Sequence, residues 1–261
     1  MPPGRVLLWV ASIGGIALAV RSVVVGPVPP TVVSVSVLVY FGLVLAGVLV
    51  PGLSMFGDVV SEGDRESSLV ALTFDDGPHP ETTRRVLELL AAAGARATFF
   101  VLGEKAAAHP DVVREIAQAG HAIGVHGFRH DRLYALKPPR AVEEDVERAV
   151  SVVRDIAGIA PRWFRPPVGQ VSPRTAAGAE RAGVTLVGWT VRGLDGFAGA
   201  DPERVAARVA RGLRGGAIVL LHDAAERDDH SPAALAALPR VLEAIARRNL
   251  RAVTLDELLS P

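Results

Sequence analysis

From residue 69 onward, short apolar runs alternate with longer segments of helical periodicity, and this alternation limits the possible folds more than any other feature. The apolar runs predict strands at residues 69–74, 96–102, 121–125, 162–165, 185–190, 217–221 and 251–255. The segments between them predict helices, each with a proline near its start, at residues 80–93, 110–119, 139–156, 173–182, 202–211 and 232–248. Strands that alternate with helices form parallel sheets. We therefore expect an α/β fold, a small or irregular (β/α) barrel of seven strands, with an open doubly wound sheet as the competing architecture.

The N-terminal part of the chain contains two apolar stretches, at residues 6–25 and 31–50, and the second carries no charge. About 20 apolar residues suffice to cross the ~30 Å core of a bilayer as a helix. The prolines between the stretches suit a turn. We expect a membrane anchor of two transmembrane helices (residues 1–56), a polar linker (57–68) and a soluble domain (69–261), in a multi-pass protein of the cell membrane.

A cleavable signal peptide is the alternative interpretation of the first stretch. Arg5 precedes it, and the Ala-Leu-Ala sequence at residues 17–19 resembles a cleavage site. The second stretch would remain after cleavage, so both interpretations predict a membrane-bound protein. Arg5, Arg21 and Arg65 show no bias that would set which side of the membrane the soluble domain faces.

Charge and cysteine content narrow the possible partners and metal ligands. The chain contains 28 Lys and Arg against 28 Asp and Glu, so no overall field favours a nucleic acid or another polyanion as a partner. The absence of Cys from the sequence excludes disulfides, thiol nucleophiles and thiolate metal sites. A metal site in this chain would therefore use His and carboxylate ligands. The oligomeric state is not indicated.

Polar residues follow several predicted strands at their C-terminal ends, where the active sites of (β/α) barrels lie. They are Asp75, Asp76, His126, His130, Arg165, Asp195, His222 and Asp223. Singly, each has a structural explanation: Asp75–Pro78 could be an Asx turn, and Trp189 is of a type common in cores. In a barrel, however, these scattered residues would converge on one face.

The combination of residue types points to metal-assisted hydrolysis. Two imidazoles and a carboxylate, here His126, His130 and Asp76, form a common site for a divalent cation with open positions for water or substrate. The two His are four residues apart, which on a helical turn would place both rings on one side. Beside a cation, Asp75 would ionise readily and could take a proton from water, whereas His222 could give a proton to a leaving group.

These motifs resemble, in order along residues 69–255, those of the NodB-type polysaccharide deacetylases, carbohydrate esterase family 4. Residues 73–77 (TFDDG) resemble the first motif, in which one Asp is the general base and the next binds the metal. Residues 126–130 (HGFRH) resemble the second, which supplies two His ligands. Residues 165–169 (RPPVG) resemble the third, whose Arg positions the base and whose backbone N–H after the prolines stabilises the oxyanion. Residues 189–196 and 221–223 resemble the fourth and fifth, in which an Asp tunes a His general acid.

The resemblance implies a distorted barrel of the NodB type that removes acetyl groups from N-acetylated sugars of a cell-surface glycan or lipid-linked saccharide. It implies a divalent ion, with Zn²⁺ as the expected metal. By position, the implied residues are the catalytic Asp75, His222, Arg165 and Asp195, the metal ligands Asp76, His126 and His130, the oxyanion donor N–H of Val168, and the substrate contacts Pro167 and Trp189.

Four departures from the family pattern leave the chemistry intact: those at residues 168, 192 and 196 put the substrate in question, and the one at residue 127 removes a hydroxyl near the metal site and is expected to alter metal affinity. Val168 replaces a usual Tyr, Arg192 an Asp, Gly196 a Trp, and Gly127 a Ser or Thr. Two alternative functions stay open: an O-deacetylase or non-sugar amidase on the same scaffold, and a membrane-tethered glycan-binding protein without catalysis.

Overall fold

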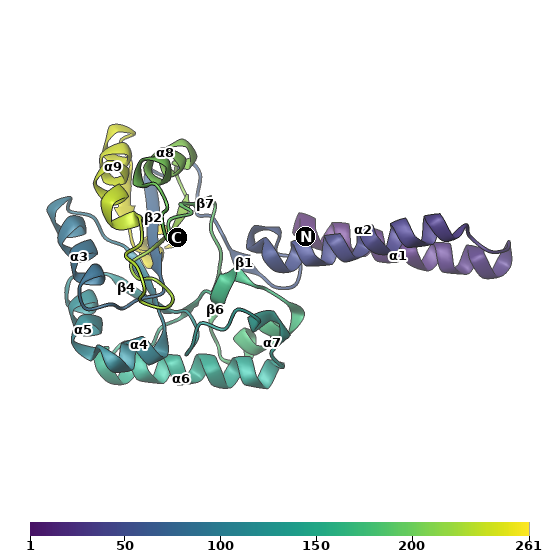
Figure 1. The fold of residues 1–261 in the computed structure, drawn as a ribbon, viewed down its shortest axis with the longest axis horizontal. Helices are drawn as coiled ribbons and strands as arrows, with labels where there is room; N and C mark the ends of the chain where they lie inside the picture. Colours follow the sequence, from purple (N-terminus) through teal and green to yellow (C-terminus); the bar gives the residue numbers. More distant parts are fainter. Residues whose placement is uncertain (261) are drawn as a thin grey trace.

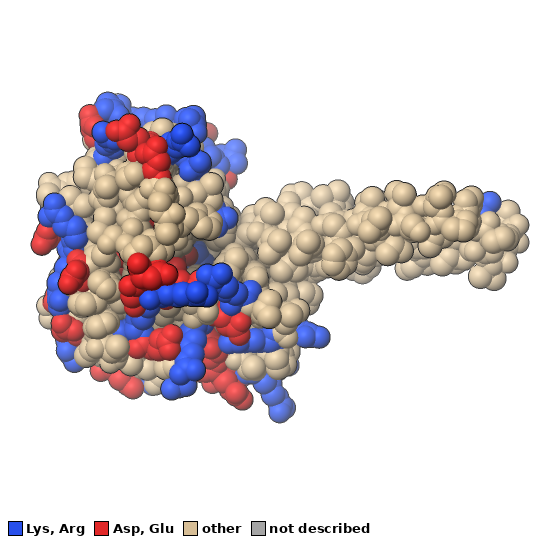
Figure 2. Space-filling model, in the orientation of Figure 1, with Lys and Arg blue, Asp and Glu red and all other residues tan. Residues whose placement is uncertain are grey.

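Two apolar helices project from one side of the molecule as a hairpin in the computed structural model, which describes residues 1–260 (Figure 1). Helix α1 (Pro3–Val24) leads away from the rest of the chain, and α2 (Pro30–Leu49) returns to it. The side chains of Ser12 and Tyr40 contact each other across the pair at 3.2 Å. Both helices are almost wholly exposed, and their only charged residues are Arg5 at the base and Arg21 near the tip of α1 (Figure 2), so they differ from core helices of a soluble domain.

A curled parallel sheet forms the rest of the structure, with helices around its outside (Figure 1). Its strand order is β1-β6-β5-β4-β3-β2-β8-β7, and β9 also pairs with β2. The strands are β1 (Val59–Val60), β2 (Leu69–Asp75), β3 (Thr98–Val101), β4 (Ala122–Val125), β5 (Trp163–Phe164), β6 (Thr185–Val187), β7 (Val191–Arg192), β8 (Ile218–His222) and β9 (Arg251–Val253). Every strand pair is parallel, which confirms the expected distorted barrel.

All six predicted helices are present, and their ends lie within two residues of the predicted bounds. They are α3 (Thr82–Ala92), α5 (Pro110–Gln118), α6 (Pro139–Ala157), α7 (Pro173–Arg181), α8 (Pro202–Gly212) and α9 (Ala234–Arg247). Side chains of Ser172 and Asp201 cap α7 and α8 by accepting backbone N–H bonds. Short elements were not predicted: α4 (Gly103–Ala108), α10 (Leu255–Leu258), and the 3₁₀ turns η1 (Pro51–Leu53), η2 (Tyr134–Leu136) and η3 (Pro167–Gly169).

The segment expected as a linker, residues 57–68, contributes to the sheet instead of hanging free. Strand β1 lies within it and pairs with β6 at the sheet edge. The base of the hairpin is attached to the domain nearby. The backbone N–H of Val171 donates to the carbonyl of Val48 at 3.0 Å, and this carbonyl is near the end of α2, where carbonyls lack partners within the helix. Arg5 pairs with Asp58 at 2.6 Å. The boundaries of anchor, linker and domain stay a prediction, and Pro261 lies outside the described residues.

Candidate active site

Strand alternation places Asp75 on the inner face of the sheet. Along β2, Leu72 and Phe74 pack in the large cluster between sheet and helices, whereas Ala71 belongs to the inner cluster. Because side chains alternate with a period of two, Asp75 also points inward, at the C-terminal end of its strand. It is 3% exposed, so whatever binds it must replace water.

Arg165, directly after β5, supplies that partner from inside the barrel. It is fully buried, and its Nη1 donates to Asp75 Oδ1 at 2.7 Å and to Thr73 Oγ1 at 2.8 Å. Its Nη2 donates to the carbonyl of Gly188 at 2.9 Å. Hydrogen bonds to the remaining polar atoms offset the cost of burying an ion pair, and of the guanidinium nitrogens only Nε has no partner among the described residues. Loss of either partner would leave the other charge buried and unpaired. Arg165 therefore holds one oxygen of Asp75 in a fixed place.

Asp76, His126 and His130 come together beside Asp75. Their ligand atoms all lie within 4.8 Å of one another. Asp76 Oδ1 is 3.5 Å from His126 Nε2 and 3.7 Å from His130 Nε2. Among the described residues this oxygen is buried and has no hydrogen-bond partner. A buried, unpartnered carboxylate oxygen between two imidazole nitrogens is what a divalent cation would satisfy, so these residues fit one.

The protonation of His126 suits it to bind a metal. Its Nδ1 is 2.7 Å from the carbonyl oxygen of Arg165, which can only accept, so Nδ1 carries the proton and Nε2 presents a lone pair toward Asp76. Burial lowers the pKa of His126, and this outweighs the opposing charges of Asp75 and Asp76. The ring is thus neutral, as a ligand must be.

The two His reach the site through a turn, which corrects the expectation of a helical turn. Residues 126–130 are not helical, and Gly127 has φ +85°, a conformation that favours glycine. The carboxylate of Asp145 on α6 accepts from the N–H of Phe128 at 2.9 Å and from the Tyr134 hydroxyl at 3.0 Å. Asp145 and Tyr134 therefore hold this loop. No sequence signal distinguishes Asp145 from the other acids of α6.

His222 ends β8 and is paired with Asp195. The ring Nδ1 is 3.2 Å from Asp195 Oδ1, and the backbone N–H of His222 donates to Asp195 Oδ2 at 2.8 Å. Burial alone would lower the pKa of His222, but the charge and hydrogen bond of Asp195, with Asp76 and Asp75, raise it to about 9. The imidazole is therefore protonated at neutral pH and can donate a proton.

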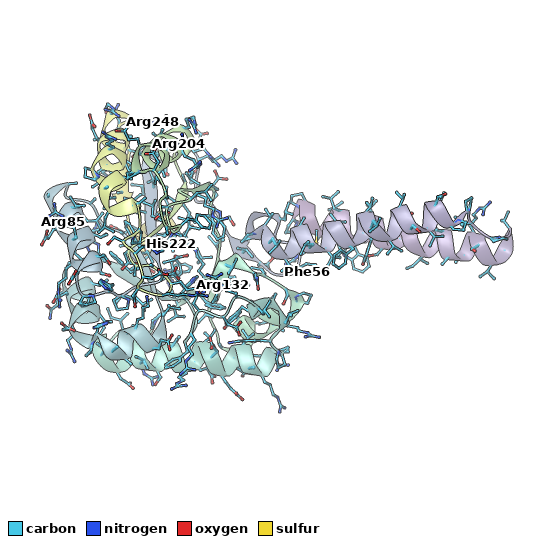
Figure 3. The ribbon with its side chains drawn as sticks, viewed as in Figure 1. Phe56, Arg85, Arg132, Arg204, His222 and Arg248 are labelled. Carbon is cyan, nitrogen blue, oxygen red and sulfur yellow. The ribbon has the colours of Figure 1, made fainter. Side chains whose placement is uncertain are left out.

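A pocket of about 340 Å³ joins these groups. Of the predicted residues, its lining includes Asp75, Asp76, His126, His130, Val168, Trp189 and His222. Arg165 and Asp195 lie beneath the lining as buried partners of Asp75 and His222. Pro167, expected as a substrate contact, is buried and absent from the described lining, because the turn η3 exposes Val168 instead. His222 and Arg132 lie in the central part of the domain in Figure 3.

Backbone strain is concentrated at this pocket. Within residues 1–260, six non-glycine residues have positive φ, and three of them line it: Asp76 (+72°), Val168 (+58°) and Leu194 (+60°). Such a conformation is especially unfavourable for a β-branched residue such as Val168. Strain of about 1–3 kcal/mol per residue persists where the surrounding structure imposes it, most often at functional sites.

Two residues that the sequence did not indicate extend the site. Glu226 Oε2 lies 3.5 Å from Nδ1 of His130, the ring nitrogen that does not face Asp76, as an ion-pair contact without the geometry of a hydrogen bond. Arg132 holds Glu226 through its Nε at 3.1 Å and its Nη2 at 2.7 Å. Both line the pocket. They come from loops 94 residues apart, so only the fold reveals the pairing.

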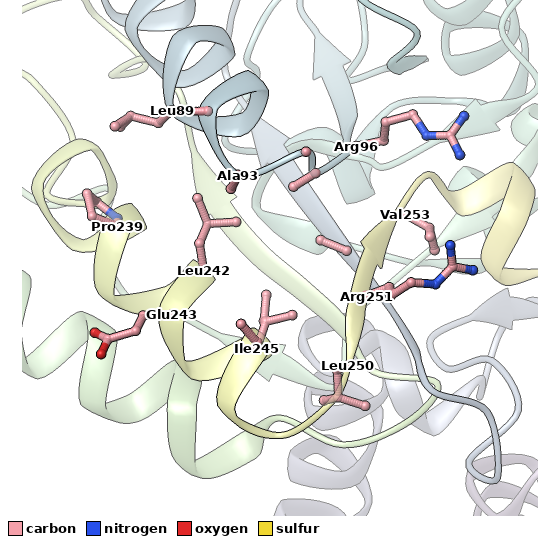
Figure 4. Close-up of a pocket in the computed structure, with 15 residues that line it drawn as sticks. Leu89, Ala93, Arg96, Pro239, Leu242, Glu243, Ile245, Leu250, Arg251 and Val253 are labelled. Atoms are coloured by element: carbon pink, nitrogen blue, oxygen red, sulfur yellow. The ribbon is translucent and has the colours of Figure 1, made fainter.

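A larger pocket, of about 650 Å³, lies elsewhere, between the ends of α3 and α9 and strand β9 (Figure 4). Its lining is mostly Ala, Leu and other apolar residues, and it contains none of the predicted site residues. It offers no nucleophile or metal-ligand cluster among its described residues. The predicted site residues that face a pocket therefore line the smaller one and not the larger one.

Known proteins are similar to this chain in both sequence and fold. The sequence profile of the family described as polysaccharide deacetylase matches residues 62–187. The chain is 30% identical over 196 residues to a peptidoglycan-N-acetylglucosamine deacetylase of Bacillus cereus, covering 75% of this chain and 70% of that protein. Among solved structures, the Bc1960 peptidoglycan N-acetylglucosamine deacetylase superposes with a TM-score of 0.71 at 29% identity, over 76% of this chain and 91% of that one. A family 4 acetyl xylan esterase from Clostridium thermocellum, in complex with a cobalt ion, superposes with a TM-score of 0.67 at 32% identity, over 73% and 89%.

Proposed function

Because this chain belongs to the polysaccharide deacetylase family, carbohydrate esterase family 4, we propose that it removes acetyl groups from N-acetylated sugars of a cell-surface glycan or a lipid-linked saccharide. It is a hydrolase of carbon–nitrogen bonds other than peptide bonds. The observation that carries the proposal is the convergence of a metal-ligand trio, an Arg-held carboxylate and a protonated His in one pocket.

Asp76, His126 and His130 would hold a divalent ion, with Zn²⁺ as the proposed metal. Their oxygen and nitrogen donors suit Zn²⁺ and similar ions, and a trio of protein ligands leaves positions open for water and substrate. When bound, such an ion supplies Lewis acidity toward the acetyl carbonyl and lowers the pKa of water toward neutrality.

The protein's own groups divide the proton transfers between them. Asp75, held by Arg165, accepts a proton from the attacking water. The backbone N–H of Val168 donates to the oxyanion that forms when water adds to the carbonyl carbon. His222 then gives its proton to the sugar nitrogen as the carbon–nitrogen bond breaks. The products are acetate and a free amine on the sugar.

The hairpin supports a place at the cell membrane. Its helices are long and apolar enough to span a bilayer, and their surfaces are exposed. A signal sequence would account for α1 alone but leaves α2 in the mature chain. The proposed substrate is therefore an acetylated glycan within reach of a membrane-bound catalytic domain.

Acetate release from N-acetylglucosamine oligomers, measured with the detergent-solubilised full chain, tests the proposal. We expect turnover that a chelator abolishes and added Zn²⁺ restores. His126→Ala should remove metal and activity together, as measured by elemental analysis and acetate assay, because it deletes a ligand. Full metal retention in that variant would contradict the ligand set, and absence of acetate release from the metal-loaded protein would contradict the activity.

Similarity to an acetyl xylan esterase gives the ester alternative a specific basis. Acetylated xylan should therefore be assayed beside the N-acetylated oligomers. We expect higher kcat/KM for the amide, because the protonated His222 can assist the departure of an amine, which is a poorer leaving group than an alcohol. Turnover confined to the ester would assign the protein to O-deacetylation.

A further inference from the structure

Nearly every charged group of the active-site pocket has a partner of opposite charge. Asp75 is paired with Arg165, and Glu226 with Arg132. His222 is paired with Asp195. Asp76 faces the place of the proposed cation. Apart from the proposed divalent cation, whose charge Asp76 balances only in part, these charges are matched locally and give the pocket little attraction for a charge on the substrate.

Arg192 is the exception. It lies at the end of β7, lines the pocket, and has an exposed side chain. Within residues 1–260 its guanidinium takes part in no ion pair and donates no hydrogen bond to the protein. Strand β7 is fixed in register by β8, with Arg192 opposite Leu220, so the backbone beneath the side chain is held by the sheet.

The indole ring of Trp189, beside Arg192, suits binding of a sugar. The guanidinium carbon of Arg192 lies over the Trp189 ring, 5.8 Å from its centre, and that of the buried Arg165 lies over the same ring at 5.7 Å. The part of the ring that lines the pocket can contact the apolar face of a sugar, while the guanidinium of Arg192 offers its N–H donors to an oxygen anion. A substrate on Trp189 would thus place a substituent near an unpaired cation.

We propose that Arg192 forms an anion subsite, so that the preferred substrate is an N-acetylated saccharide carrying a carboxylate or phosphate group next to the reacting sugar. This inference rests on the proposed function. The carboxylate of an acidic sugar and the phosphate of a lipid-linked sugar share the chemistry that Arg192 recognises, and bidentate binding to either is a property of guanidinium.

Three probes distinguish these sources: tetra-N-acetylchitotetraose, which is neutral, the N-acetylglucosaminyl-N-acetylmuramic acid disaccharide, which carries a carboxylate, and a short-chain polyprenyl diphosphate N-acetylglucosamine. The measured quantity is the ratio of kcat/KM for each anionic probe to that for the neutral one, with the metal-loaded full chain. In Arg192→Gln we expect this ratio to fall roughly 10- to 100-fold for the true substrate class, in line with a lost charge-assisted hydrogen bond. Arg192→Lys should retain a large part of the preference, because it keeps the charge.

Arg204→Gln is the matched control, because this exposed arginine at α8 lies far from His222 in Figure 3 and from the pocket lining. The preference of the native protein should also weaken as salt is raised from low to physiological concentration. If the anionic-to-neutral ratio of kcat/KM is the same in Arg192→Gln and in the native protein for both anionic probes, the inference is overturned. Acetate release from the neutral oligomer would in that case still support the proposed function. Absence of acetate from all three probes would overturn both.

Discussion

Replacing Asp195 with Asn tests whether this buried carboxylate keeps His222 protonated. Asn preserves the size of the side chain and can still accept the backbone N–H of His222. It removes the negative charge that lies 3.2 Å from the ring. Burial, which disfavours the charged imidazolium, is then opposed only by the more distant Asp75 and Asp76. The pKa of His222 should therefore fall from about 9 to its ordinary value of about 6.5 or below.

The size of the effect follows from the protonated fraction. With a pKa of about 9, roughly 90% of His222 is protonated at pH 8, and nearly all at pH 6. With a pKa of about 6.5, about 3% is protonated at pH 8 and about 75% at pH 6. The acid is needed in its protonated form, so kcat in Asp195→Asn should fall about 30-fold at pH 8 but less than twofold at pH 6, apart from any factor that is constant with pH.

The assay is acetate release at saturating substrate between pH 6 and pH 9.5, with metal content checked at each pH. The native protein should lose activity as pH rises through about 9, and the Asn variant as it rises through about 6.5. Asp229→Asn is the matched control, since it removes the charge from another Asp–His pair, Asp229 with His230 at 2.6 Å, on the exposed loop. If the pH profile of kcat in Asp195→Asn has the same shape as that of the native protein, the charge of Asp195 does not raise the pKa of His222.

Three further predictions concern the base, the metal site and the core. Asp75→Asn should keep its metal by elemental analysis yet lose about 10²- to 10⁴-fold in kcat, because the base is gone and the ligands are not; an active variant would exclude Asp75 as the base. Glu226→Gln should weaken Zn²⁺ binding about 10- to 100-fold in a chelator competition, because it weakens the partner of a ligand ring, whereas the exposed Glu104→Gln should bind as the native protein does. Leu90→Ala, in the fully buried face of α3, should lower the free energy of unfolding in urea by about 2–5 kcal/mol, and a loss below 1 kcal/mol would contradict tight packing there.

The larger elements could be predicted because their signals are local. A proline fixes the first turn of α5, α6, α7 and α8, and amphipathic spacing does the rest. Strands β1 and β7 were not predicted: each has two residues, too few to show alternation, and no separate apolar run marked either one, unlike the equally short β5. These strands form by pairing with strands distant in the sequence, as when Val59 pairs with Leu186. Such pairing produces no pattern in the neighbouring residues from which it could be predicted.

The site shows the same division. Asp75, Asp76, His126 and His222 could be selected because each directly follows a strand that the sequence predicts, and strand ends meet at one edge. Glu226 and Asp145 could not, since their importance lies in single contacts with residues far along the chain. The spacing of His126 and His130 indicated that the two rings lie close together, as they do, but the expected helical turn was wrong, because Gly127 adopts a turn that residue spacing does not reveal.

The contacts between the hairpin and the domain also bear on the distance between the pocket and a membrane. Pro51, just after α2, packs against Gly169 and Gly188, and Gly188 in turn accepts a hydrogen bond from Arg165. With α1 and α2 in a bilayer, the pocket would be held at a constant distance and tilt above the lipid surface, unlike a domain joined to its anchor by a flexible linker. In the proposed membrane-bound state, the pocket would reach only those acetylated sugars that lie at this distance from the lipid surface.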